Sequence, residues 1–136
     1  MTPRVALKRL SFLAVASVAF TVACADVVVD DTVVEAVSEG RARVIVALNL
    51  PGGFRPEGSL TEDEVHAQRA AIVESQEAII DELAETDARV IRRMTSLPFL
   101  ALEIGPESLD ALLAMPERVA RITADEALAP NTRIEP

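Results

Sequence analysis

Four short segments of the chain have the residue pattern of β-strands. Aliphatic and β-branched residues dominate each of them, and Pro or Gly lies close to most of their ends. The segments are residues 43–50, 88–94, 99–104 and 119–124. Because side chains alternate between the two faces of a strand, Leu100, Leu102 and Ile104 fall on the same face of the third segment. We therefore expect four strands, each with one buried face.

A long amphipathic helix is expected between residues 62 and 85. It begins with capping-box spacing at Thr61 and Glu64, and acidic residues follow on the side opposite its apolar stripe. The stripe comprises Val65, Ile72, Ile79, Ile80 and Leu83. Gln68 and Gln76 fall near the edge of this stripe.

A second, shorter helix is bounded by two prolines. Pro106 suits the first turn of a helix, and Pro116 pushes the residue before it out of helical geometry. Leu109, Leu112 and Leu113 mark the face that we expect to be buried.

The order strand, helix, strand, strand, helix, strand predicts an α+β fold of the ferredoxin-like split βαββαβ kind. Such a fold has a four-stranded antiparallel sheet with two helices on one face. The expected helix-facing residues are Val44, Val46, Leu48, Leu100, Leu102 and Ile104. The other face would carry Ile45, Ala47, Phe99 and Ala101. A partly apolar open sheet face suggests contact with a partner.

The first 25 residues have the layout of a secretory signal peptide. Basic residues precede an apolar run from Leu10 to Val22, and small residues follow before Asp26. The run is shorter than the ~20 residues of a spanning helix. We expect export, secreted or periplasmic, either with cleavage after Ala25 or with Cys24 as the lipid-modified residue of a lipoprotein.

The residues between this signal and the first strand mix valines with acids and keep no helical period. We interpret residues 26–41 as an acidic linker, with a short edge strand as the alternative. The domain proper would span residues 42–125. Residues 126–136 contain two prolines and no periodicity, which indicates an extended C-terminal tail.

The charge of the chain limits its partners. The net charge is −9, and without residues 1–25 it becomes −12, with 10 basic against 22 acidic residues. A domain this acidic repels nucleic acid and anionic membranes, so we expect membrane contact only through a lipid on Cys24. Cys24 is the single cysteine, which excludes a disulfide within the chain.

The sequence contains no catalytic, metal or cofactor motif that we recognise. His66 is the only histidine, and no nucleophile elbow or phosphate-binding loop accompanies it. The acidic pairs lack the alternating oxygen ligands and central glycine of a calcium loop. We therefore expect no catalytic residue, no metal ion, no cofactor and no enzymatic activity.

Several pieces in a fixed order resemble the propeptide domains of subtilisin-like serine proteases, which also occur as free inhibitors. The pieces are the strand RVIVAL, the helix with Gln68-Arg69, Ile72 and Gln76, the hairpin VIRRMTSLPFLALEI, and the closing segment LDALLAMPERVARITAD. The resemblance covers residues 43–131, about two thirds of the chain.

The resemblance implies an inhibitor, or a folding chaperone acting in trans, because no protease domain follows residue 136 in this sequence. The open sheet face would lie on two surface helices of the protease, with Glu103 and Asp125 capping helix N-termini. The tail would enter the cleft like a cleaved product. Its residues in the subsites would be Leu128, Ala129, Pro130 and Asn131, with Leu128 in an apolar pocket.

A different reading remains open at this point. An exported or lipid-anchored ferredoxin-like binding module could use the same fold for another partner, because this fold hosts many functions. The tail separates the two readings, since only a product-like inhibitor requires residues 125–131. In either case we expect a monomer when the domain is free.

Overall fold

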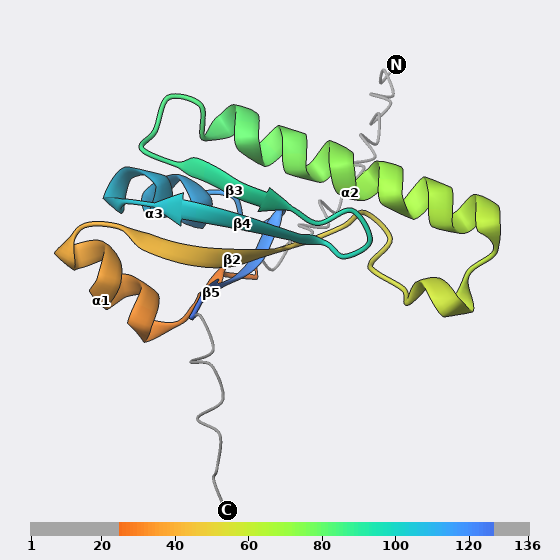
Figure 1. Ribbon diagram of the computed structural model, residues 1–136, viewed down its shortest axis with the longest axis horizontal. Helices are drawn as coiled ribbons and strands as arrows, with labels where there is room; N and C mark the ends of the chain where they lie inside the picture. The colour runs from red at the N-terminus through yellow and green to blue at the C-terminus, as the bar shows by residue number, and fades with distance from the viewer. Residues whose placement is uncertain (1–24, 127–136) are drawn as a thin grey trace, which may run out of the picture.

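A five-stranded mixed sheet and three α-helices form an α+β fold in the computed structural model, which describes residues 25–126 (Figure 1). The strands are β1 (Val28–Val29), β2 (Ala42–Leu48), β3 (Arg89–Arg93), β4 (Phe99–Ile104) and β5 (Val119–Ala124). The helices are α1 (Asp31–Glu39), α2 (Glu62–Glu82) and α3 (Pro106–Leu113), with a short 3-10 turn, η1 (Glu57–Ser59), before α2.

Strand β2 lies in the middle of the sheet, whose order is β1-β5-β2-β4-β3. It pairs antiparallel with β4 on one side and with β5 on the other, so Val46 lies between Leu100 and Ile122. The expected pairing of segments 43–50 and 99–104 is therefore confirmed. Strand β1 pairs parallel with β5. The sequence predicts a four-stranded antiparallel sheet with two helices. The structure adds a fifth strand, β1, and a third helix, α1.

The interpretation of residues 26–41 as a linker is wrong, because the segment folds into β1 and α1. Val33 and Val37 lie one helical turn apart on α1 and are both buried in the core. Val28 and Val29 form the edge strand that was the alternative interpretation. Gly40 then ends α1 with a φ of 150°, a conformation that glycine adopts readily.

The core lies between the helices and one face of the sheet. All six residues expected to face the helices are at most 6% exposed, which confirms the predicted alternation of β2 and β4. Buried residues of α1, α2 and α3 join them in one cluster: Val33, Val37, Ile79, Leu109 and Leu112. Leu113 was expected in this set but is 41% exposed, because it follows Leu112 on the outward side of α3.

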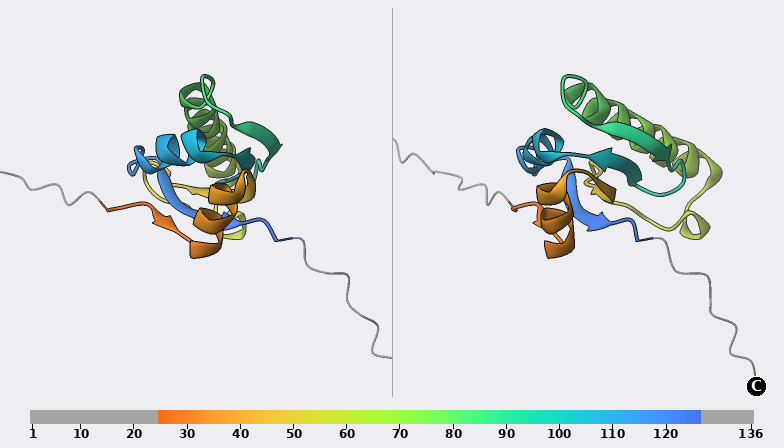
Figure 2. Two further views of the ribbon diagram at one scale, coloured as in Figure 1. Left: turned by 90° about the vertical axis from the view of Figure 1, so that its left-hand side faces the viewer. Right: turned by 60° about the vertical axis from the view of Figure 1, so that its left-hand side comes forward.

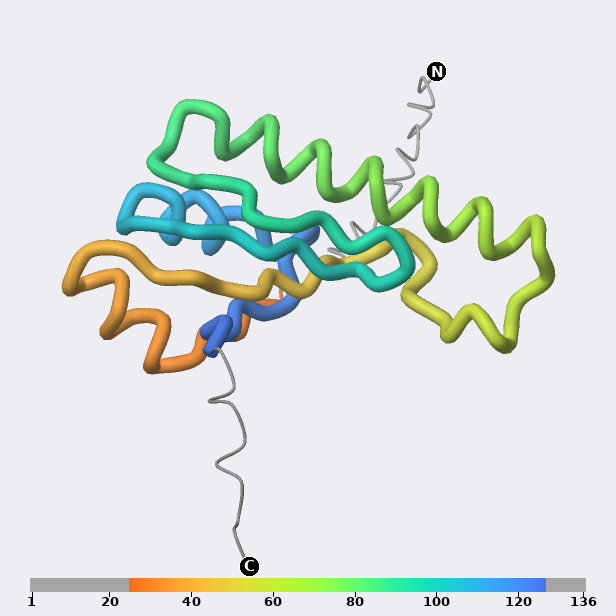
Figure 3. Tube along the Cα trace, viewed as in Figure 1, coloured from red at the N-terminus to blue at the C-terminus, as the bar shows by residue number. Residues whose placement is uncertain are grey.

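Helix α2 is longer than the sheet that it covers. With 21 residues it is about 30 Å long, whereas the seven residues of β2 span about 23 Å. The N-terminal half of α2 and the loop before it therefore extend beyond the strands, as the chain trace shows (Figure 3). The capping box at Thr61 and Glu64 is confirmed at the start of α2.

Gln76 is fully buried rather than at the edge of the apolar stripe. Its Nε2 donates hydrogen bonds to the carbonyl oxygens of Met94 and Phe99, at 2.8 and 2.9 Å. These two residues flank the turn between β3 and β4. One amide side chain therefore fastens the β3–β4 hairpin to α2, which lie side by side in both views of Figure 2.

We expect Leu102→Ala to lower the free energy of unfolding by about 2–5 kcal/mol, because it empties a fully buried site on β4. The matched control is Leu113→Ala, which should cost about 1 kcal/mol or less because Leu113 is largely solvated. Chemical denaturation measures both losses. Equal losses would contradict the burial described here.

Two adjacent valines test whether α1 belongs to the cooperative fold. Val33 is fully buried and Val34 is 50% exposed. Val33→Ala should lower the free energy of unfolding by about 1–2 kcal/mol, while Val34→Ala should change it by about 0.5 kcal/mol or less. A single denaturation transition with no loss in Val33→Ala would show that α1 does not contribute to the domain's stability.

Candidate protein-docking face

The face of the sheet opposite the core is the open face. Strand alternation and register assign it the odd-numbered residues of β2 and β4, together with Arg121 and Thr123 of β5, whereas the irregular register at Leu48 turns Val119 into the core. The four apolar residues expected there, Ile45, Ala47, Phe99 and Ala101, all lie on it. They are partly exposed except for Ala101, whose small side chain is only 4% exposed between its neighbours.

One row across the open face consists of charged residues of alternating sign. Glu103 is the register partner of Arg43 on one side and of Arg89 on the other. Asp125 follows next to Arg43, whose carbonyl oxygen accepts a hydrogen bond from the Asp125 amide at 2.8 Å. Opposite charges on neighbouring strands are favourable cross-strand pairs. Glu103 and Asp125, the two acids expected to contact a partner, therefore lie in one row.

The middle of the open face is apolar and is flanked by further arginines. Ile91 is the extra residue where the β3–β4 register shifts, and it is 37% exposed. Ile91, Ile45 and Met94 line the same shallow hollow of about 270 Å³. Arg92 pairs with Ala101 beside this centre, and Arg121 pairs with Ala47. An apolar centre with a charged rim is typical of protein interfaces.

Arg41 connects the charged row to the helix layer. Its Nε lies 2.9 Å from Glu103 Oε1, and its Nη2 donates to the carbonyl oxygen of Asp87 at 2.5 Å. The Asp87 carboxylate accepts hydrogen bonds from the amide and the hydroxyl of Ser108 at the start of α3. A Cβ at Gly105 would collide with Asp87 Oδ2, so a larger residue there would displace this carboxylate.

These contacts change the ionisation of Asp87. The Ser108 hydroxyl lowers the pKa of the Asp87 carboxyl, and the amides of Ser108 and Gly105 and the charge of Arg41 act in the same direction. Each of them favours the charged form. Asp87 is therefore an ionised cap that joins α3 to the turn before β3.

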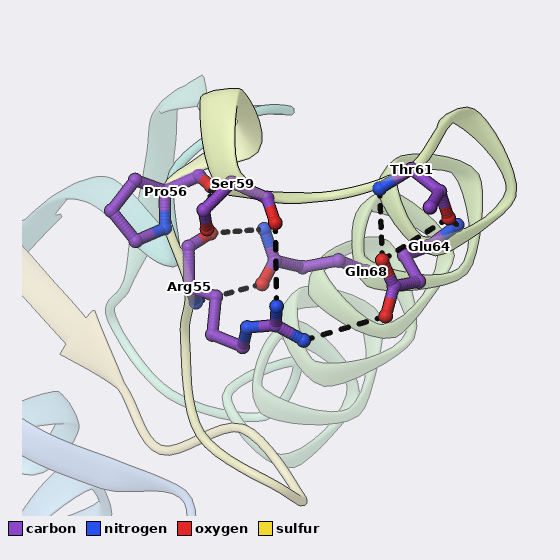
Figure 4. Close-up of polar contacts among 6 residues, drawn as sticks. All are labelled: Arg55, Pro56, Ser59, Thr61, Glu64 and Gln68. Atoms are coloured by element: carbon purple, nitrogen blue, oxygen red, sulfur yellow. Dashed lines mark hydrogen bonds and ion pairs between the residues drawn. The ribbon is translucent and has the colours of Figure 1, made fainter.

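A second polar cluster holds the loop between β2 and α2. The Gln68 side chain accepts a hydrogen bond from the Arg55 amide and donates one to the Arg55 carbonyl, both at 2.9 Å (Figure 4). The Arg55 guanidinium reaches Glu64, and Arg69 binds Glu57 at 2.6 Å. The pKa of Glu64 is lowered mainly by the Thr61 amide. This cluster stabilises the part of α2 that extends past the sheet.

The described residues contain no group of three potential metal ligands, and His66 is exposed on α2. None of the helices within residues 25–126 is long and apolar enough to cross a membrane. The other predicted site residues lie outside the described residues: Cys24, Leu128, Ala129, Pro130 and Asn131. The expected signal peptide, apart from Ala25, and the expected tail, apart from Glu126, lie outside them too.

Sequence reasoning missed the arginines of the open face. Arg43 and Arg121 could have been found, because each lies next to an apolar residue of its own strand that faces the core, Val44 and Ile122. Arg92 could not, because its side of the sheet depends on the extra residue at Ile91.

Comparisons of this chain with models of protein families, with curated protein sequences and with solved structures find no match.

The Asp87 cap predicts a pH-dependent stability. Because the pKa of Asp87 is lowered in the folded state, its contribution is complete above the unfolded pKa of about 4 and is lost as pH falls through the folded pKa. Wild type should therefore unfold at higher urea concentration than Asp87→Asn at neutral pH, and this difference should shrink as pH falls below about 4.

Asp81→Asn is the control for this measurement. Asp81 is exposed on α2, and its carboxylate has no hydrogen-bond partner among residues 25–126. The measurement is the urea midpoint of wild type, Asp87→Asn and Asp81→Asn over a series of pH values. If the Asp87 and Asp81 variants behave alike, the cap does not contribute.

Proposed function

We propose that this chain is an exported inhibitor of a subtilisin-like serine protease, or a folding chaperone for one. The open face would dock on the protease and the C-terminal tail would enter the active-site cleft. The observation that carries the proposal is that the tail leaves the domain at the charged row of the open face. Strand β5 ends at Ala124, opposite Val44, and the next residue, Asp125, belongs to that row.

The arrangement of the strands supports the family resemblance. Strands β5-β2-β4-β3 are consecutively antiparallel, and α2 and α3 connect them in the order of a βαββαβ unit. We propose that this part is a ferredoxin-like split domain to which β1 and α1 have been added. The addition covers the outer side of β5, and its buried residues, Val33 and Val37, join the core rather than the open face.

The tail would act as a cleaved product that the enzyme releases slowly. Main-chain hydrogen bonds would add it as a strand to an edge of the protease, and Leu128 would occupy an apolar subsite. Pro130 fixes one φ angle and so lowers the entropy lost on binding. Asn131 would lie next to the catalytic serine. Docking of the open face would hold these residues at high local concentration near the cleft.

The charged row has a defined part in this proposal. Carboxylates are favourable near helix N-termini, where backbone amides lack partners. Asp125 has no ion pair among the described residues, whereas Glu103 is paired with Arg41. Asp125 is therefore the better candidate for capping a protease helix, with Glu103 contributing if Arg41 moves.

The test is the inhibition constant of the chain from Asp26 onward, which contains every described helix and strand. It is measured against subtilisin-like proteases beside two variants, a chain that ends at Glu126 and Leu128→Asp. The shortened chain should keep its stability, because all described contacts remain, but lose most of its potency. Leu128→Asp should weaken inhibition at least tenfold, because burying an unpaired charge costs more than ~1.4 kcal/mol.

Leu97→Asp is the control for the added charge, because Leu97 is 41% exposed in the turn between β3 and β4. Equal potency of the full chain and both tail variants would exclude a tail in the cleft. It would favour a binding module with a different mode of contact. Failure of the full chain to inhibit any protease of this class would overturn the proposed function itself.

A further inference from the structure

Four arginines on the open face have no ion pair among residues 25–126. They are Arg43, Arg89, Arg92 and Arg121, and all four are exposed. The ion pairs within the described residues use Arg41, Arg55 and Arg69 instead. Within the described strands and Asp125, which follows β5, only two acids, Glu103 and Asp125, share the face with them, and Arg41 already pairs with Glu103.

This positive face belongs to a chain with a net charge of −9. The acids gather elsewhere, for example along the outward side of α2, where Glu74, Glu77 and Asp81 are exposed. The charges are therefore segregated: arginines outnumber acids on the open face, and acids line the outward side of α2. Segregation of this kind orients a partner before contact, because fields of several kT act over a Debye length.

The occupant of such a face is a protein surface rather than a long polyanion. A nucleic acid or an anionic membrane would extend past the face and meet the acidic remainder of the chain, which repels it. The centre of the face is apolar at Ile45, Ile91 and Phe99, and a phosphate backbone offers no apolar surface to pack against these side chains. Apolar centres with arginine at the rim match protein partners.

Resting on the proposed function, we infer that the open face selects a protease whose docking surface carries carboxylates opposite Arg43, Arg92 and Arg121. The tail residues would determine how slowly the complex dissociates. The arginines would determine how fast it forms and which proteases it forms with, because rim charges act mainly on association rates. Subtilisin-like proteases with a basic docking surface would be rejected by like charge.

The experiment measures association rate constants of the chain from Asp26 to Pro136 with a subtilisin-like protease that it inhibits. The variants are Arg92→Glu and Arg121→Glu. The control is Arg118→Glu, which changes the net charge equally but lies away from the open face, in the hollow beside α2. Circular dichroism confirms folding, and Arg121→Glu carries the test if Arg92→Glu does not fold.

At about 20 mM NaCl, each open-face variant should associate roughly tenfold more slowly than wild type, and the control less than about twofold. The difference should nearly vanish at about 0.5 M NaCl, because salt screens these charges. Arg92→Lys should retain the wild-type rate. The inference would be overturned if the open-face variants associate as fast as Arg118→Glu, or if salt does not reduce the difference in rate. In that case inhibition by wild type would still support the proposed function. If wild type inhibits no such protease, both proposals fall together.

Discussion

The alternation of side chains along β2 and β4 is the constraint on which the rest of the structure depends. Val44, Val46 and Leu102 are fully buried on one side, so the helices must cover that side. The intervening residues are then fixed on the other side, where no buried helix residue meets them within the described chain. A slip of one residue in the β2–β4 register would exchange the two faces. The core and the open face are therefore two results of one pattern.

The sequence predicts the parts of this fold that repeat over several turns or strands. Strands β4 and β5 have the predicted bounds, and the capping box begins α2 where expected. Helix α1 was missed because nine residues with only two buried valines give too short a period to recognise. Gln76 was misplaced because its burial depends on two carbonyl groups that only the hairpin supplies. The pattern of apolar side chains is visible within one segment of the sequence, whereas these hydrogen-bond partners lie 18 and 23 residues from Gln76.

The candidate site was predictable in its apolar part and not in its charge. Ile45, Phe99 and their neighbours follow from strand parity alone. The positive character of the face arises from arginines on three different strands, and Arg92 reaches it only through an irregular register. Adding charges along the chain gives a strongly acidic molecule. The structure divides this total charge between a positive face and a more negative remainder. A partner that docks on the open face meets the positive part.

The two edges of the sheet have a consequence for how this domain can meet other chains. On one side β1 is only two residues long, and on the other β3 carries three arginines and a bulge. Short, charged or bulged edge strands resist extension by a strand from another molecule, which is the usual start of aggregation. The domain is therefore shielded from growing into a continuous sheet with its own copies at high concentration. Within the described residues, protected edges thus accompany a sheet face that no helix covers, so contact with a partner is directed to the face and not to the edges.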